Sequence, residues 1–248
     1  MRIRYLYPIA LLTLFVAFVT CGGAIFGYNI SDYHEQVAPE KQYTYVSRYA
    51  ELSEHDSHFR DAAGIIGYDW TLIAAIAFTE SRFDSTAVSS AGATGIMQVM
   101  PNTLRGFNIP DSMHMDARTN IFAATELLRS LDKRFRHVKD PAERINFVLA
   151  SYNAGYGHIL DAMRFAKREG KDRFVWENNV DTFLILKSRP EYYNDTLCRN
   201  GKFEGWRETL QFVSKVQRNW KRFKRTQQLY SDSISRLVES DSTFRLME

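Results

Sequence analysis

A single glutamate, Glu80, stands near the end of an apolar segment and before a loop that contains glycine. The apolar segment spans residues 73–83, and the loop spans residues 89–101. A carboxyl group at the end of a buried helix has a raised pKa, because an apolar environment disfavours its ionised form. Such an acid can protonate a glycosidic oxygen and then, as carboxylate, deprotonate the incoming nucleophile. The pattern therefore predicts acid catalysis on a sugar or acyl substrate.

The loop carries groups that suit a carbohydrate ligand. Gly92 and Gly95 allow backbone conformations closed to other residues and a close approach of the chain to a ligand. Ser89 and Gln98 supply a hydroxyl and an amide, which can hydrogen-bond to sugar hydroxyl and acetamido groups. Taken alone, Glu80 also fits a solvated residue at a helix end, and the loop fits a turn that leads into a core segment. Both interpretations stay open at this point.

Helical periodicity supplies the elements that position these groups. Asp69 is placed to cap a helix that is apolar almost all round, which predicts a central helix. A helix from Tyr45 to Ile66, ending near Gly64 or Gly67, is predicted to cover the core beside it.

Further helices are predicted along the rest of the chain. One begins at Thr119 or Asn120, and a second starts at Asp140-Pro141 and ends at Gly155. A third spans residues 159–167, and a fourth runs from Trp206 to about Phe223. Residues 171–205 are expected to be irregular and to cover one flank of a cleft. Since no strand-like alternation of any length occurs, the predicted fold class is mainly α.

Composition narrows the class of protein. The chain has 248 residues, of which 45% are hydrophobic, enough for one main domain. The net charge of +3 does not indicate a basic surface for binding nucleic acid. The two cysteines lie far apart and the histidines show no zincin-like pairing, so neither a disulfide framework nor a metal site is expected.

The first 30 residues predict export. Arg2 and Arg4 precede an uncharged apolar run, which is typical of an export signal. Two fates remain open. Cys21 resembles the lipidated cysteine of a bacterial lipoprotein, while the uncharged stretch to Ile30 is long enough to remain as a membrane anchor of about 20 residues. In the second case the positive end stays cytoplasmic.

Three separated groups of residues resemble one enzyme family. They are Glu80-Ser81 with loop residues 89–103, the run Ala150-Ser151-Tyr152-Asn153-Ala154-Gly155, and a later set with Pro190-Glu191-Tyr192-Tyr193-Asn194-Asp195 and Glu208-Thr209. Together they resemble the soluble-type lytic transglycosylases, and above all the catalytic half of the membrane-bound type F. The resemblance covers roughly residues 55 to 225 and implies a goose-lysozyme-like helical domain with a substrate groove.

The resemblance also implies roles for particular residues. Glu80 would be the sole general acid and base. The predicted groove residues are Ser89, Gln98, Met100, Tyr152 and Asn153, with Glu208 near the groove. The implied reaction cleaves the bond between N-acetylmuramic acid and N-acetylglucosamine in peptidoglycan and closes a 1,6-anhydro ring, with no metal or organic cofactor. Asp84 is too near Glu80 in sequence to be an obvious second acid, and the motif around Glu80 offers no other. One carboxyl suffices if the substrate supplies its own nucleophile.

Two alternative functions remain open, namely a muramidase that uses water and a non-catalytic peptidoglycan-binding module. The expected organisation is a signal or anchor over residues 1–30, a linker over 31–44, the catalytic domain over 45–225, and a helical or disordered tail over 226–248. We expect a monomer on the periplasmic side of the cell envelope. It would be tethered to a membrane, either as an outer-membrane lipoprotein or through an inner-membrane anchor.

Overall fold

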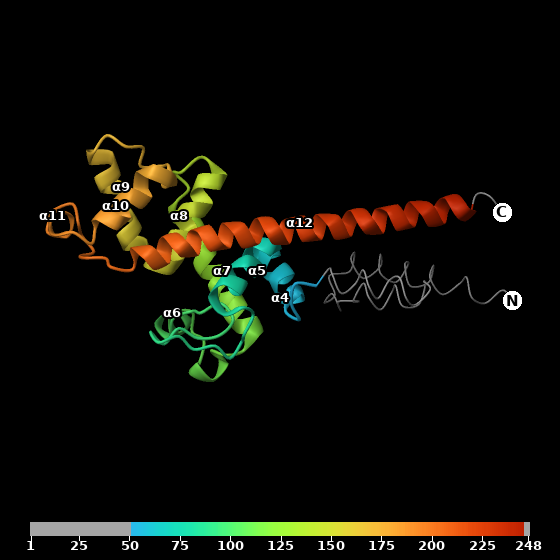
Figure 1. Cartoon of the computed structure of the whole chain (residues 1–248). Coiled ribbons are helices and arrows are strands. Elements are labelled where there is room, and N and C mark those ends of the chain that lie inside the picture. Colours follow the sequence, from blue (N-terminus) through green and yellow to red (C-terminus); the bar gives the residue numbers. More distant parts are fainter. Residues whose placement is uncertain (1–50, 246–248) are drawn as a thin grey trace. The chain divides into compact units, whose positions relative to one another are not determined.

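The computed structural model describes the backbone of residues 51–245 and the side chains of residues 51–236 (Figure 1). The predicted export signal with Cys21, the linker over residues 31–44 and the start of the helix predicted from Tyr45 lie outside the described residues. The described chain consists of helices and loops, and its only β-type pairing is the isolated bridges Val88–Thr94 and Thr94–Val99. The prediction of a mainly α fold is confirmed.

The elements follow one another as a series of helices of very different lengths. In chain order they are α4 (Asp56–Ile66), α5 (Trp70–Ser81), α6 (Pro101–Gly106), η1 (Asp111–Met113), α7 (Ala117–Arg134), α8 (Pro141–Ala154), α9 (Tyr156–Arg168), η2 (Trp176–Val180), α10 (Asp181–Leu186), α11 (Pro190–Tyr193) and α12 (Trp206–Arg245).

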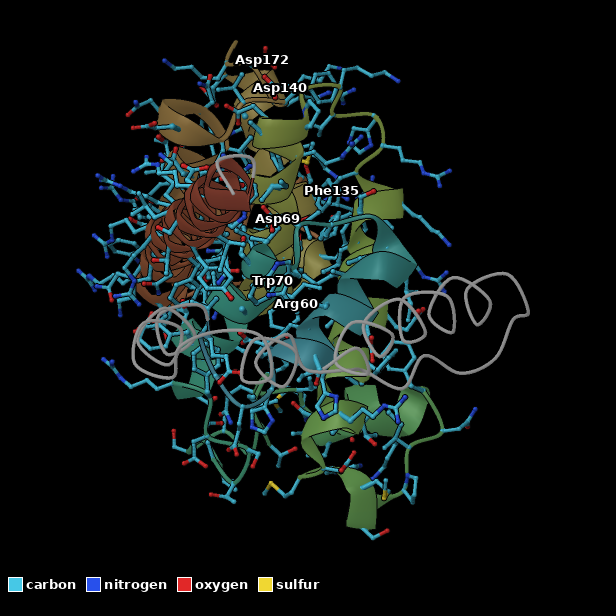
Figure 2. All side chains as sticks on the ribbon, turned by 90° about the vertical axis from the view of Figure 1, so that its right-hand side faces the viewer. Arg60, Asp69, Trp70, Phe135, Asp140 and Asp172 are labelled. Atoms are coloured by element: carbon cyan, nitrogen blue, oxygen red, sulfur yellow. The ribbon has the colours of Figure 1, made fainter. Side chains whose placement is uncertain are left out.

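Helix α5 is central because it is apolar on every side. Its residues from Leu72 to Ala77 are at most 2% exposed, and α4 and α12 both pack against it. The carboxylate of Asp69, labelled in Figure 2, accepts the N–H of Thr71 at 3.0 Å and satisfies one of the free donors of the first turn. The predicted cap and the predicted central position are both confirmed.

Two predicted helices differ from the structure. The helix expected to run unbroken to Ile66 is not helical over residues 51–55. Helix α4 begins at Asp56 because the carboxylate of this residue accepts the N–H groups of Leu52 at 2.9 Å and Ser53 at 3.1 Å, which turns the chain before the helix. Helix α7 begins at Ala117, ahead of the predicted start, because Asp116 is the capping residue and accepts the N–H of Thr119 at 2.8 Å.

Other boundaries agree with the predictions. Gly67 ends α4 in the left-handed conformation with φ of 71°. Asp140, labelled in Figure 2, caps α8 and is followed by Pro141 at the first helical position. Helix α8 ends at Ala154, immediately before Gly155.

The C-terminal part is more helical than predicted. The segment expected to be irregular contains η2, α10 and α11, and α12 continues past Phe223 to Arg245. Phe212, Val213, Val216 and Phe223 are at most 5% exposed, and α12 packs on α5 and α8. Among the described residues, no helix combines the length and the apolar character needed to cross a membrane.

Candidate active site

Glu80 occupies the last turn of α5, where the core meets the surface. Its side chain is partly buried, and burial raises the pKa of its carboxyl from the ordinary value of 4.5 to about 8. Within the described residues no hydrogen bond or ion pair holds this carboxyl. Directly after it, Arg82 and Phe83 adopt positive φ angles of 58° and 70°. These values are uncommon for residues with a side chain and turn the chain sharply away from the acid.

The glycine loop is tied to the end of α5 beside Glu80. The hydroxyl of Ser81 donates to the carbonyl oxygen of Ile96 at 2.8 Å. Within the loop, the Ser89 hydroxyl accepts the N–H of Ala93 at 2.9 Å. The amide nitrogen of Gln98 donates to the carbonyl oxygens of Ala87 and Gly95 at 3.0 and 2.9 Å. The side chains of Ser89 and Gln98 therefore shape the loop. Among the described residues, the amide oxygen of Gln98 and the O–H of Ser89 have no hydrogen-bond partner and can still bond to a ligand.

Asn120 on α7 anchors the same loop and was not identified from the sequence. Its side chain is fully buried, accepts the N–H of Met97 at 2.9 Å and donates to the carbonyl oxygens of Thr94 and His114, both at 3.0 Å. A Cβ on Gly95 would lie 2.6 Å from the amide nitrogen of Asn120. Glycine is therefore required at position 95 so that the loop can lie directly on this amide.

Tyr152 near the end of α8 faces the acid. Its hydroxyl donates to the carbonyl oxygen of Met97 at 2.7 Å, and its ring stacks on Phe212 with the centroids 6.2 Å apart. Burial, and next the negative charge of Glu80, hold the pKa of Tyr152 well above its ordinary value of 10. The phenol therefore stays neutral near the carboxyl, and it links α8, the loop and α12 around Glu80.

Asn153 is held from the start of α12. The Thr209 hydroxyl, which is fully buried, lies 2.8 Å from the amide oxygen of Asn153 and 2.9 Å from the carbonyl oxygen of Gly205. Because its oxygen faces Thr209, the exposed Asn153 side chain has its NH₂ group available to a ligand. Glu208 precedes Thr209 and is exposed.

The predicted site residues thus fall into two groups. The structure brings Glu80, Tyr152 and the loop around Gln98 together, and Asn153 follows Tyr152 along α8. Met100 is 45% exposed and Glu208 is exposed, and among the described residues no hydrogen bond or ion pair joins either of them to Glu80. Groove roles for Ser89, Gln98, Met100, Tyr152, Asn153 and Glu208 stay predictions.

Two cavities lie apart from Glu80. One of about 340 Å³ is lined by residues that include Leu160 and Met163 of α9, and one of about 280 Å³ is lined by residues that include Tyr68 and Asp132. Neither cavity is lined by Glu80. The acid is identified by the raised pKa of its carboxyl and not by a cavity, since a glycan strand needs an open groove. The predicted groove itself stays a prediction.

A buried ion pair, which was not identified from the sequence, holds the segment that leads into α12. Lys187 donates to Asp161 at 2.5 Å, and both side chains are fully buried. Asp161 also accepts the N–H groups of Arg199 and Asn200 at 3.1 and 2.9 Å. Burial alone would raise the pKa of Asp161, but these hydrogen bonds together hold it below its ordinary value. No local sequence pattern marks partners so far apart in the chain.

Comparison with known proteins supports the family resemblance. Residues 57–175 match the family model described as Transglycosylase SLT domain. The chain is 36% identical over 168 residues to a membrane-bound lytic murein transglycosylase F from Desulfosudis oleivorans, covering 68% of this chain and 34% of that protein. A relative with the same name from Marinobacter nauticus is 33% identical over 191 residues, covering 77% and 35%. This chain spans about a third of the length of these relatives.

Solved structures give similar matches. The 70 kDa soluble lytic transglycosylase from Escherichia coli aligns with a TM-score of 0.48 at 20% identity, covering 77% of this chain and 27% of that one. An inactive mutant of the lytic transglycosylase Slt from Pseudomonas aeruginosa aligns with a TM-score of 0.44 at 23% identity, covering 69% and 24%.

Proposed function

We propose that this chain, in which residues 57–175 form a transglycosylase SLT domain, is a peptidoglycan lytic transglycosylase with Glu80 as its acid. The observation that carries the proposal is the burial of Glu80 at the meeting point of α5, the glycine loop and Tyr152, which raises the pKa of its carboxyl to about 8. A carboxyl with that pKa is mostly protonated at neutral pH and can donate its proton. The names of the relatives, which are murein transglycosylases, agree with this chemistry.

In the proposed reaction Glu80 first acts as an acid. It gives its proton to the oxygen between N-acetylmuramic acid and N-acetylglucosamine, and the bond from the muramoyl C1 to that oxygen breaks. The Glu80 carboxylate then takes the proton of the muramoyl 6-hydroxyl, whose oxygen bonds to C1 and closes the 1,6-anhydro ring. Proton count is conserved, and Glu80 returns to its protonated state.

A single acid is favoured by what surrounds Glu80. Burial is the cause of its raised pKa, and no neighbouring carboxylate contributes among the described residues. Hydrolytic glycosidases generally use a second carboxyl as base or nucleophile. Cleavage that uses the substrate's own hydroxyl needs only one, which supports the lytic reaction over a water-using muramidase.

Product analysis on purified sacculi tests the proposal. The wild-type chain is expected to release anhydromuropeptides, and Glu80→Gln to release none while keeping its circular dichroism spectrum. Asp84→Asn is the matched control, because Asp84 is exposed and its carboxylate bonds to Thr86 at 2.7–2.8 Å in a local turn. Substantial release by Glu80→Gln would refute the role of the acid. Reducing ends in place of anhydro ends would establish a muramidase, and sacculus binding without any product would establish a binding module.

We also propose that the domain is exported and tethered to a membrane through residues 1–30. The basic residues before an apolar run support export, and the curated relatives are named membrane-bound. Incorporation of radiolabelled fatty acid, and its loss in Cys21→Ser, is expected for a lipoprotein. Membrane retention without label would support an uncleaved anchor instead.

A further inference from the structure

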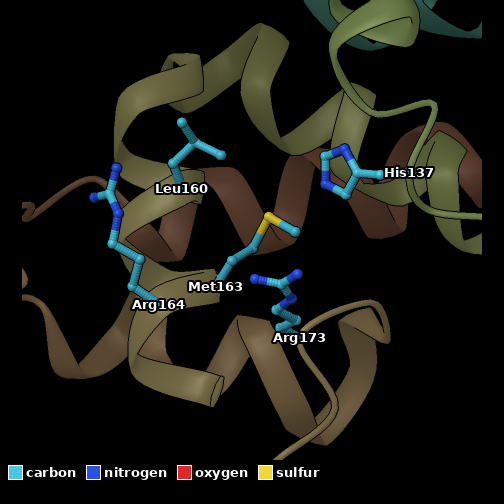
Figure 3. A pocket seen from close by; sticks show the side chains of 5 residues that line it. All are labelled: His137, Leu160, Met163, Arg164 and Arg173. Atoms are coloured by element: carbon cyan, nitrogen blue, oxygen red, sulfur yellow. The ribbon is translucent and has the colours of Figure 1, made fainter. Parts of the chain in front are cut away.

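A small cavity lies beside α9, away from the acid. It has a volume of about 340 Å³ and is lined by His137, Leu160, Met163, Arg164 and Arg173 (Figure 3). This volume lies at the lower end of the range of about 300–1,000 Å³ that is typical of ligand pockets. Glu80, by contrast, is surrounded by α5, the glycine loop and α8. The cavity is therefore a candidate for a second, smaller binding site.

The ring of Phe174 contacts two exposed residues at the rim of the cavity, Arg173 and His137. The guanidinium of Arg173 lies over the ring of Phe174, 4.6 Å from its centroid, and His137 meets the same ring edge-on at 5.7 Å. In Figure 3 the end of the Arg173 side chain points between Met163 and His137. Phe174 therefore holds both side chains in place at the mouth of the cavity. Because Arg173 and His137 are already held, they lose little side-chain entropy when a ligand binds them.

The charge of Arg173 is uncompensated within the described residues. Arg164, on the other side of the cavity, already pairs with Asp161 and contacts the carbonyl oxygen of Leu197. The neighbouring acid Asp172 turns to the backbone, where its carboxylate accepts the N–H of Phe174 at 2.8 Å. Arg173 is thus the guanidinium left to form a charge-assisted pair, and guanidinium groups match carboxylates in a two-pronged geometry.

The floor of the cavity is apolar. Met163 is 5% exposed, and Leu160 is partly buried beside it. Inorganic phosphate would engage the rim but leave this floor uncovered. A carboxylate joined to a short aliphatic group would satisfy Arg173 and cover Met163 together.

We propose that this cavity binds the C-terminal carboxylate of a short peptide whose last residues have small aliphatic side chains. The identification of the source rests on the proposed function, since the glycan strands of peptidoglycan carry short peptides. The cavity would then bind the peptide of a strand at a distance from the cleaved bond. The binding chemistry itself depends only on Arg173, His137 and the floor of α9.

Binding can be measured without any turnover. The full chain carrying Glu80→Gln is labelled with ¹³C at the methyl groups of its seven methionines, and the Met163 signal is assigned by Met163→Leu. N-acetyl-D-alanyl-D-alanine is then titrated while the methyl spectrum is recorded. We expect a saturable shift of the Met163 signal. The C-terminal amide of the same dipeptide should bind about tenfold more weakly, as expected for the loss of one charge-assisted hydrogen bond.

Arg173→Gln tests the assignment of the cation, and Arg60→Gln is its control. Arg60 is also an exposed arginine over an aromatic ring, 3.8 Å from the centroid of Trp70, but it lies on α4 (Figure 2). Affinity should fall about tenfold in Arg173→Gln and stay unchanged in Arg60→Gln. Three results would each overturn the proposal. They are no shift of the Met163 methyl signal, equal affinities for the dipeptide and its C-terminal amide, and displacement of the dipeptide by inorganic phosphate as readily as by more dipeptide. The proposed cleavage would survive all three, because it is assayed separately through Glu80.

Discussion

The hydroxyl of Tyr152 donates a 2.7 Å hydrogen bond to the carbonyl oxygen of Met97, joining the end of α8 to the glycine loop. Met97 in turn donates its N–H to Asn120 of α7. The chain of contacts therefore runs from α7 through the loop to the tyrosine that lies close to Glu80. Two helices that are distant in sequence, α7 and α8, therefore fix the surroundings of one acid through the loop.

Tyr152→Phe is expected to loosen this connection without emptying the core. The change leaves the carbonyl oxygen of Met97 without this donor, at a cost of about 1–3 kcal/mol in the free energy of unfolding. We expect the rate of product release to fall about tenfold, because the loop beside Glu80 is less firmly held. Urea unfolding and product analysis measure the two effects.

Tyr156→Phe provides the control for this change. The Tyr156 ring also packs on a phenylalanine, Phe135, at 5.2 Å, and its hydroxyl has no hydrogen-bond partner among the described residues. Equal losses in both variants would show that the bond to Met97 has no special role.

Gly95→Ala and Gly92→Ala separate two reasons for glycine in the loop. Both positions have positive φ, 76° and 85°, so alanine costs each about 1–2 kcal/mol in backbone strain. Only at Gly95 does the added Cβ meet Asn120, which adds about 1–3 kcal/mol of overpacking. Gly95→Ala should therefore unfold at the lower urea concentration and lose more activity. Identical unfolding midpoints for the two variants would contradict the close packing of Gly95 on Asn120.

Stability should depend on pH through Glu80. Its pKa is raised on folding, from 4.5 to about 8, so the folded state holds a proton that the unfolded state releases at neutral pH. The contribution of Glu80 to stability is complete below about pH 4.5 and is lost as the pH rises through 8. The free energy of unfolding should fall over this window in the wild type and change less in Glu80→Gln. Activity, which needs the protonated acid, should fall with an apparent pKa near 8. Parallel stability profiles of the two proteins would refute the raised pKa.

The buried pair of Lys187 and Asp161 should matter far more than an exposed one. Lys187→Met leaves Asp161 without its ammonium partner, and removing one member of a buried pair costs about 3–5 kcal/mol. Lys202→Met is the control, since the pair of Lys202 with Glu204 is solvent-exposed and its loss should leave stability nearly unchanged. Comparable unfolding midpoints for the two variants would show that the buried pair does not hold the segment before α12.

The sequence determined the features that depend on neighbours in the chain. The caps at Asp69 and Asp140 and the apolar character of α5 follow from local patterns and were predicted correctly. The end of α4 at Gly67 is one of the two predicted ends, and the pattern alone did not choose between Gly64 and Gly67. The position of Glu80 at the end of the central helix followed from the same reasoning. Local hydrogen bonds and hydrophobic period act over a few residues and so can be read from a single sequence.

Only the tertiary structure decided what surrounds that acid. Asn120 under the loop, Thr209 against Asn153, and Lys187 against Asp161 join residues that are far apart in sequence, and no local pattern marks them. The sequence predicted that the pKa of Glu80 is raised, but tertiary packing decides how far it rises. A carboxyl keeps its proton because the folded chain removes water from it, and that burial exists only when α5, α8, α12 and the loop pack together.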